Sequence, residues 1–285
     1  MSLPTTLIEK SIRLPNAVTL QYAEQGAADG IPVILVHGYP DSWRSYVPVM
    51  AHLPEQLRVI ALSLRGYGRS DRSYGSYHPR DLAADLNEFM VRLGIPAAYI
   101  VGHSMGSYVA EYLALDHPGR VLGLVLIGTF RTLAARVDLA ELLAGLEQMD
   151  EEVDLNLVRD FQQSTLAQAV PAEFLEEIIA ESAQVPGHVW RGALRELMRI
   201  DHFDELRQIT APTIIFWGDQ DGMSNLRDQH AGAAAIGGEL RLYAGAGHSL
   251  HWEEPKRFAQ DLAKLIEQIE TLGTAPTRTF SQHRR

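Results

Sequence analysis

The chain has 285 residues, of which 46% are hydrophobic, and this length can bury one complete core together with an insertion. Its formal net charge of -11 disfavours nucleic acids and anionic membrane surfaces as partners. There is no cysteine, so disulfides and thiol chemistry are excluded and the redox compartment is left open.

The first residues lack a basic region followed by an apolar run, which is the pattern of a secretory signal. No apolar stretch of the sequence is long enough to span a bilayer. We therefore expect a cytoplasmic protein without a membrane partner.

Short apolar runs alternate along the chain with helical patterns. The runs are typical of strands that are buried on both faces, and they cover residues 33–36, 59–62, 99–101, 121–127, 213–217 and 240–243. A stripe from Leu82 to Leu93 has helical spacing, with Pro79 at its start and Gly94 at its end, and a similar stripe follows Pro255. This alternation predicts an α/β protein with a mostly parallel sheet covered by helices on both faces.

Residues 131–205 interrupt the alternation, because this segment contains helical patterns only. We predict a core formed by residues 1–130 and 206–272, and a helical cap or lid formed by residues 131–205. The last residues, 273–285, are rich in Thr, Pro and Arg and are predicted to be disordered.

Residues 102–106 read Gly-His-Ser-Met-Gly and lie between an apolar run and a helical pattern. This places Ser104 on a sharp strand-to-helix turn, which lifts its hydroxyl clear of both elements. Gly102 and Gly106 are needed sterically, since a Cβ at either position would collide with the tight backbone. The pentapeptide alone is weak evidence, and the other candidates must supply the context.

A serine hydroxyl needs an imidazole to take its proton and a buried carboxylate to orient that imidazole. The run 211–217 breaks at Gly218, and Asp219 and Asp221 follow it. Residues 239–248 repeat the pattern, with a strand, a glycine-rich turn and then His248. Ser104, an aspartate and His248 therefore all fall on loops at strand ends, with either aspartate able to serve as the acid.

With these residues in this order, the chain resembles an α/β-hydrolase over about 270 residues. The sequence His-Gly-Tyr-Pro-Asp-Ser-Trp at 37–43 resembles the oxyanion loop of the epoxide hydrolase and haloalkane dehalogenase branch, and 65–71 resembles the loop after its next strand. The resemblance implies an eight-stranded sheet with the cap inserted after the sixth strand. It also implies that Asp221 is the acid, with Asp219 as the second choice, and that the Tyr39-Pro40 bond is cis.

At three sites this chain differs from the enzymes of that branch, and these differences indicate which reaction it catalyses. Its enzymes attack with an aspartate where this chain has Ser104. Epoxide hydrolases use lid tyrosines, but residues 131–205 contain none, and the halide-binding positions of the dehalogenases are Tyr39 and Met105 here. The remaining resemblance is to a serine esterase, lactonase or cofactor-free perhydrolase. A fourth departure, Ser63 in place of the usual Asp before Leu-Arg-Gly, puts the anchoring of that loop in doubt.

We expect His248 to deprotonate Ser104, which attacks an ester carbonyl, and the backbone N–H groups of Tyr39 and Met105 to hold the oxyanion. Water activated by His248 then hydrolyses the acyl-enzyme, and no cofactor is required. The apolar cap favours a small hydrophobic ester or lactone as the substrate. A perhydrolase or haloperoxidase-like activity, a slow-turnover ligand receptor and a cyanohydrin lyase remain alternatives. The sequence leaves the oligomeric state open, with a monomer and a homodimer as the two candidates.

Several nearby residues have two interpretations. His37 and His103 line the pocket or are structural histidines held by hydrogen bonds, and Trp43 and Trp217 line the pocket or pack the core. His248, His251, Glu253 and Glu254 could suggest a metal site, but the His-Glu-x-x-His spacing is missing, so no metal is predicted.

Overall fold

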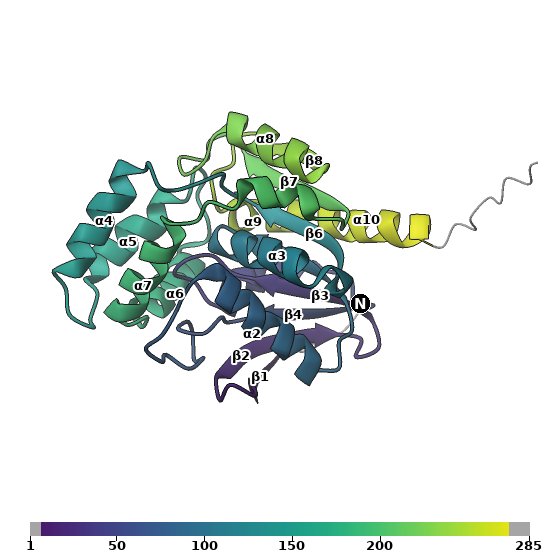
Figure 1. Ribbon diagram of the computed structural model, residues 1–285, viewed down its shortest axis with the longest axis horizontal. Helices are drawn as coiled ribbons and strands as arrows, with labels where there is room; N and C mark the ends of the chain where they lie inside the picture. The colour runs from purple at the N-terminus through teal and green to yellow at the C-terminus, as the bar shows by residue number, and fades with distance from the viewer. Residues whose placement is uncertain (1–6, 274–285) are drawn as a thin grey trace, which may run out of the picture.

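A computed structural model describes residues 7–273 and shows one sheet of eight strands (Figure 1). The order of the strands across the sheet is β1-β2-β4-β3-β5-β6-β7-β8. Their bounds are β1 Ile8–Arg13, β2 Thr19–Gly26, β3 Ile31–Val36, β4 Leu57–Leu62, β5 Ala98–His103, β6 Val121–Ile127, β7 Thr213–Gly218 and β8 Glu239–Tyr243.

The sheet is mostly parallel, as the alternation of elements predicts. β2 pairs antiparallel with both β1 and β4, and every other neighbouring pair is parallel. The six predicted apolar runs are confirmed as the six strands from β3 to β8, each within two residues at either end.

Helices cover both faces of the sheet, and each face has its own hydrophobic core. One face carries α2 (Pro79–Arg92), α3 (Met105–Asp116) and α8 (Leu226–Ile236), and the other carries α1 (Val47–Met50), α9 (Leu250–Glu253) and α10 (Pro255–Gly273) (Figure 1). Single turns of 3-10 helix, η1 (Trp43–Tyr46) and η2 (Pro118–Arg120), lie in the connecting segments. The eight-stranded α/β sheet of the sequence analysis is therefore confirmed.

Local sequence sets the ends of α2. Pro79 is the first helical residue, and the side chain of His78 before it accepts a hydrogen bond from the N–H of Arg80. Proline suits this position because its missing N–H has no partner in the first turn. The helix ends before Gly94, whose φ of +66° is readily adopted only by glycine.

Four helices and one 3-10 segment lie between β6 and β7, which is the place predicted for the cap. They are α4 (Val137–Glu147), α5 (Leu155–Ser164), α6 (Ala172–Ala183), α7 (Gly187–Leu197) and η3 (Phe203–Gln208). α4 to α7 pack together at one end of the sheet, on the left in Figure 1. The cap therefore stands beside the carboxyl ends of the parallel strands.

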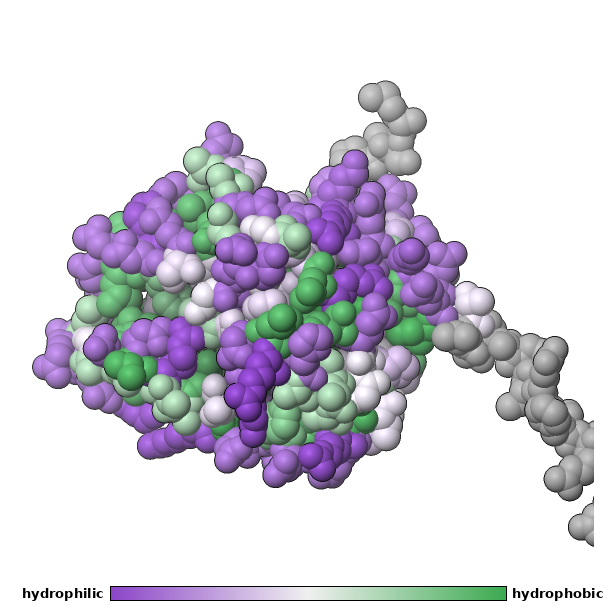
Figure 2. Space-filling view, turned by 90° about the horizontal axis from the view of Figure 1, so that it is seen from above, coloured by the Kyte–Doolittle hydropathy of each residue, from purple (hydrophilic) through white to green (hydrophobic). Residues whose placement is uncertain are grey.

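Within residues 7–273, no helix has the length and apolar character needed to cross a membrane. The face in Figure 2 is largely hydrophilic, with apolar residues in patches between the polar ones. Residues 274–285 of the tail that was predicted to be disordered lie outside the described part of the chain.

Candidate active site

Ser104 lies at a strained turn between β5 and α3. Its backbone φ of +53° falls in a region that non-glycine residues rarely adopt, and its N–H donates to the carbonyl of Ile127 at 2.9 Å. Strain of this kind persists where the surrounding structure over-determines the backbone, and it concentrates at functional sites. The side chain is partly exposed, whereas the flanking residues His103 and Met105 are buried.

Two glycines make this turn possible, as the sequence predicts. A Cβ on Gly102 would lie 2.2 Å from the carbonyl oxygen of Gly106, and a Cβ on Gly106 would lie 2.3 Å from the carbonyl oxygen of Val36. Both obstacles are backbone atoms, so no side-chain rotation can relieve the clash. The pattern around Ser104 is thus required by the geometry of the elbow.

His248 and Asp221 form a buried pair. Nδ1 of His248 lies 3.0 Å from Oδ2 of Asp221, although the two residues are 27 positions apart. Since a carboxylate only accepts, Nδ1 carries the proton and Nε2 presents its lone pair. Nε2 is buried and has no hydrogen-bond partner among residues 7–273, which leaves it free to accept a proton.

Asp221 is held by further donors from its own loop. Oδ1 accepts from the N–H groups of Met223 and Ser224, and Oδ2 also accepts from the Ser224 hydroxyl at 2.7 Å. Burial alone would raise the pKa of Asp221, but the neighbouring His248 and these hydrogen bonds outweigh it and hold the pKa below its usual value. Asp219 is exposed and accepts instead from the N–H of Gly245, so Asp221 is the partner of His248.

Two backbone N–H groups flank the pocket near Ser104. Met105 is the first residue of α3, where an N–H has no intrahelical partner and the helix dipole favours negative charge. The N–H of Tyr39 likewise makes no hydrogen bond within the described chain. The Tyr39-Pro40 bond is cis, as the resemblance implies.

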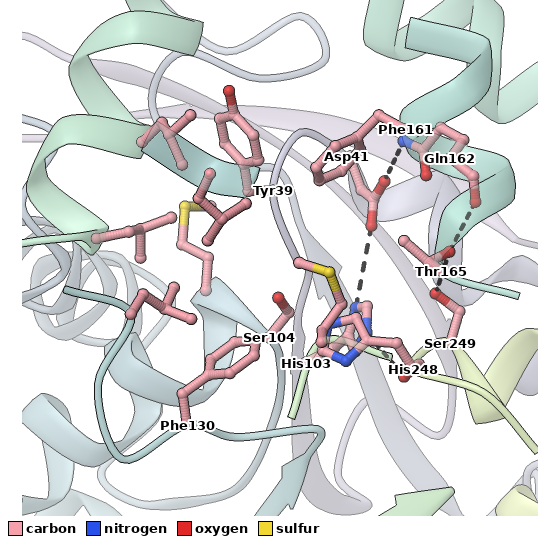
Figure 3. Close-up of a pocket in the computed structure, with 16 residues that line it drawn as sticks. Tyr39, Asp41, His103, Ser104, Phe130, Phe161, Gln162, Thr165, His248 and Ser249 are labelled. Carbon is pink, nitrogen blue, oxygen red and sulfur yellow. Dashed lines mark hydrogen bonds and ion pairs between the residues drawn. The ribbon is translucent and has the colours of Figure 1, made fainter. Parts of the chain in front are cut away.

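A pocket contains Ser104 and His248, and its walls come from both the core and the cap (Figure 3). The empty space between its lining atoms is about 480 Å³, the mouth included. The apolar lining comprises Phe130, Leu133, Leu139, Phe161, Leu194, Leu197 and Met223. Most of this wall belongs to cap helices, so the cap contributes the apolar surface that the sequence suggests.

One side of the pocket is mainly polar, with Phe161 beside Asp41 and Gln162 (Figure 3), and sequence reasoning missed these polar groups. Asp41 is 3% exposed, and its Oδ1 accepts from the side-chain amide of Gln162 in α5 at 2.9 Å (Figure 3). Burial raises the pKa of Asp41 to about 7. Thr165 and Ser249 continue this side, with the Ser249 hydroxyl donating to that of Thr165 at 3.0 Å. The cap is thereby tied to the loop that carries His248.

Of the four candidate pocket residues, only His103 lines the pocket. His37 is fully buried, where Nδ1 donates to Gly38 and Nε2 accepts from the N–H of Leu64, so it is structural. Trp43 is wrong as a lining residue because it packs in the hydrophobic core that also contains residues of α1 and α9. Trp217 is also wrong, since its ring N–H donates to Ser224 at 2.9 Å and braces the loop of Asp221.

Two residues whose roles the sequence left open, Glu253 and Ser63, make structural hydrogen bonds. Glu253 accepts from the N–H groups of Ala167 and Gly247 through different oxygens, so it joins the cap to the His248 loop. Ser63 replaces the usual aspartate, and its hydroxyl accepts from the N–H of Trp43 at 3.1 Å. The loop that this departure put in doubt is therefore still anchored through a side chain.

Comparisons with known proteins agree with this fold. The family model described as the alpha/beta hydrolase fold matches residues 31–255. A soluble epoxide hydrolase from Corynebacterium sp. is 36% identical over 102 residues, covering 36% of this chain and 35% of that enzyme's length. A non-heme chloroperoxidase from Streptomyces lividans is 26% identical over 278 residues, covering 90% of this chain and 99% of that protein. An esterase structure from Exiguobacterium antarcticum superimposes with a TM-score of 0.84 at 22% identity, covering 91% of this chain and 100% of the esterase.

Proposed function

Because the chain belongs to the α/β-hydrolase family, we propose that it is a serine hydrolase cleaving a carboxylic ester or lactone of a small, largely hydrophobic substrate. The observation that carries the proposal is the buried His248, with Nδ1 on Asp221 and a free Nε2, in the same pocket as the strained Ser104. A hydroxyl nucleophile requires a base oriented in this way. Nε2 makes no hydrogen bond to Ser104 among residues 7–273 of this structure, and we expect that bond to form in the complex with substrate.

In the proposed mechanism, Nε2 of His248 takes the proton of Ser104 as its oxygen attacks the ester carbonyl. The tetrahedral oxyanion accepts hydrogen bonds from the N–H groups of Tyr39 and Met105, and losing one such donor costs about 3 kcal/mol of transition-state stabilisation. His248 then returns the proton to the leaving alcohol. Water activated by the same imidazole releases the acid and restores Ser104, so the chain itself supplies every catalytic group.

The apolar wall supports a hydrophobic acyl or aryl group as the recognised part of the substrate. Leu194, Leu197 and Phe161 of the cap exclude water from the pocket and can contact such a group. A panel of aryl esters of increasing acyl length tests this, and activity on acetate esters alone would contradict it.

The nucleophile is tested directly with a fluorophosphonate probe. We expect one adduct per chain, located on Ser104 by peptide mass spectrometry, and no adduct in Ser104→Ala. A matched Ser249→Ala variant, which removes another hydroxyl of the same pocket, should still be labelled. An adduct on a different residue would contradict the proposal.

The likeness to a chloroperoxidase along nearly the whole chain favours perhydrolysis as a second activity. Hydrogen peroxide would then replace water at the acyl-enzyme and leave as a peracid, with the proton going to His248 and back to Ser104. Peracid formation from acetate and peroxide, measured against Ser104→Ala, tests this activity.

A further inference from the structure

The polar side of the pocket contains two facing atoms that lack partners. Oδ2 of Asp41 has no hydrogen-bond partner among residues 7–273, and it lies 4.0 Å from Nδ1 of His103. Nδ1 is itself buried and unpartnered within the same part of the chain. Because 4.0 Å is too long for a hydrogen bond, the two atoms do not satisfy each other. Buried polar atoms are normally paired, so this gap points to a ligand group.

The chemistry of His103 is fixed by its other nitrogen. Nε2 lies 3.3 Å from the carbonyl oxygen of His248, and a carbonyl can only accept. Nε2 therefore carries the hydrogen, and Nδ1 is an acceptor. Burial and the adjacent His251 and His248 rings hold the pKa of His103 well below its usual value, which keeps the ring neutral. A group that binds at Nδ1 must donate a hydrogen bond.

The chemistry of Asp41 is complementary. Its Oδ1 accepts from Gln162, whose amide nitrogen also donates to Ser182 at 2.8 Å, so Gln162 is fixed between two acceptors. Burial, opposed by the Gln162 hydrogen bond, raises the pKa of Asp41 to about 7. With Oδ1 engaged as an acceptor, the carboxylic proton resides on Oδ2. Below about pH 7 the gap is therefore bounded by a donor on one side and an acceptor on the other.

One oxygen that both accepts and donates can bridge this gap with two bonds of ordinary length. We propose that Asp41 and His103 form a subsite that binds a hydroxyl group of the substrate, so that the preferred ester carries a hydroxyl on its polar end and an apolar group against the cap. This inference rests on the proposed ester hydrolysis and names its substrate class. A methyl group in the same position would leave the buried Nδ1 of His103 unpaired and would shield Oδ2 of Asp41 from any other partner, which is the costly case.

Two pairs of isosteric esters test the subsite. Methyl 3-hydroxybutyrate is compared with methyl 3-methylbutyrate for a hydroxyl on the acid, and 2-hydroxyethyl butyrate with propyl butyrate for a hydroxyl on the alcohol. The readout is the ratio of kcat/KM within each pair. We expect the wild-type enzyme to prefer the hydroxyl ester in at least one pair by about tenfold or more.

Two variants separate a hydrogen-bonding role from a structural one. Asp41→Leu removes the bridge, and it should lower the hydroxyl preference by about tenfold or more. Asp41→Asn keeps an acceptor for Gln162 and places an N–H donor toward the gap, so the preference should stay within about threefold of the wild-type value. Thermal unfolding and fluorophosphonate labelling of each variant establish that the fold and Ser104 are intact.

The subsite is refuted if the wild type shows no hydroxyl preference in either pair. It is also refuted if Asp41→Leu slows the hydrolysis of both esters of a pair equally, because Asp41 would then be assigned to holding the hydrolytic water. A loss of the hydroxyl preference in Asp41→Asn as large as that in Asp41→Leu would refute it as well. Failure of the proposed function looks different, because neither labelling of Ser104 nor cleavage of any of the four esters would then be seen.

Discussion

Replacing Asp221 by asparagine should invert the hydrogen-bonding pattern of His248. Oδ1 of Asp221 accepts from two backbone N–H groups, so the amide oxygen of the variant occupies that position and its NH₂ group replaces Oδ2. The NH₂ group then faces Nδ1 of His248, which must become an acceptor. The ring proton moves to Nε2, where it blocks transfer from Ser104. The change thus removes the base while leaving every side chain in place.

We expect Asp221→Asn to lower kcat by about 10⁴-fold, the loss typical of a wrong tautomer in such a triad. This corresponds to about 5 kcal/mol of transition-state stabilisation. The assay is steady-state hydrolysis of an aryl butyrate at neutral pH. Asp219→Asn is the matched control, because Asp219 is exposed and the amide oxygen of the variant can still accept from the N–H of Gly245. This variant should retain activity within about threefold of wild type. A loss below tenfold in Asp221→Asn would refute the tautomer argument.

Three further predictions concern stability and specificity. In the folded state burial raises the pKa of Asp41 from the ordinary 3.8 to about 7. Between these two pH values the folded state keeps a proton that the unfolded chain releases, so the free energy of unfolding falls as pH rises from about 4 to about 7. Asparagine does not titrate, so Asp41→Asn should not lose the roughly 4 kcal/mol of unfolding free energy that the wild type loses in this window. In urea unfolding, the stability of Asp41→Asn relative to wild type should therefore be higher at pH 8 than at pH 4, and a pH-independent difference would contradict this. Gly106→Ala places a Cβ 2.3 Å from the carbonyl of Val36 and should cost about 3 kcal/mol, measured by denaturant unfolding, and an unchanged midpoint would contradict the clash. Leu197→Ala removes part of the apolar wall, so the acyl length preferred in an aryl ester series should shift upward by about two carbons; an unchanged optimum would place the acyl group elsewhere.

The sequence predicted the parts of the fold that local pattern determines. Buried parallel strands are continuous apolar runs, so β3 to β8 were found from the local sequence pattern alone. β1 is exposed along most of its length and has no apolar run, so only the family resemblance implied the two strands at that edge. Ser104 was recognisable because its elbow needs glycines at fixed positions.

Contacts across long sequence separations could not be predicted in this way. Asp41 and Gln162 are 121 positions apart, and no local pattern joins a loop after β3 to a helix of the cap. The same limit applied to Asp219 and Asp221, since only the side-chain directions distinguish the exposed aspartate from the partner of His248. Trp43 and Trp217 were ambiguous because a large aromatic side chain fits a core as well as a pocket.

The central claim is that His248 activates Ser104, and the rate of phosphonylation measures this most directly. Wild type and His248→Ala are treated with the same fluorophosphonate, and the adduct is quantified and located by mass spectrometry. We predict modification of Ser104 alone, at a rate at least about 10³-fold lower in His248→Ala. Equal rates in the two proteins, or an adduct on another residue, would contradict it.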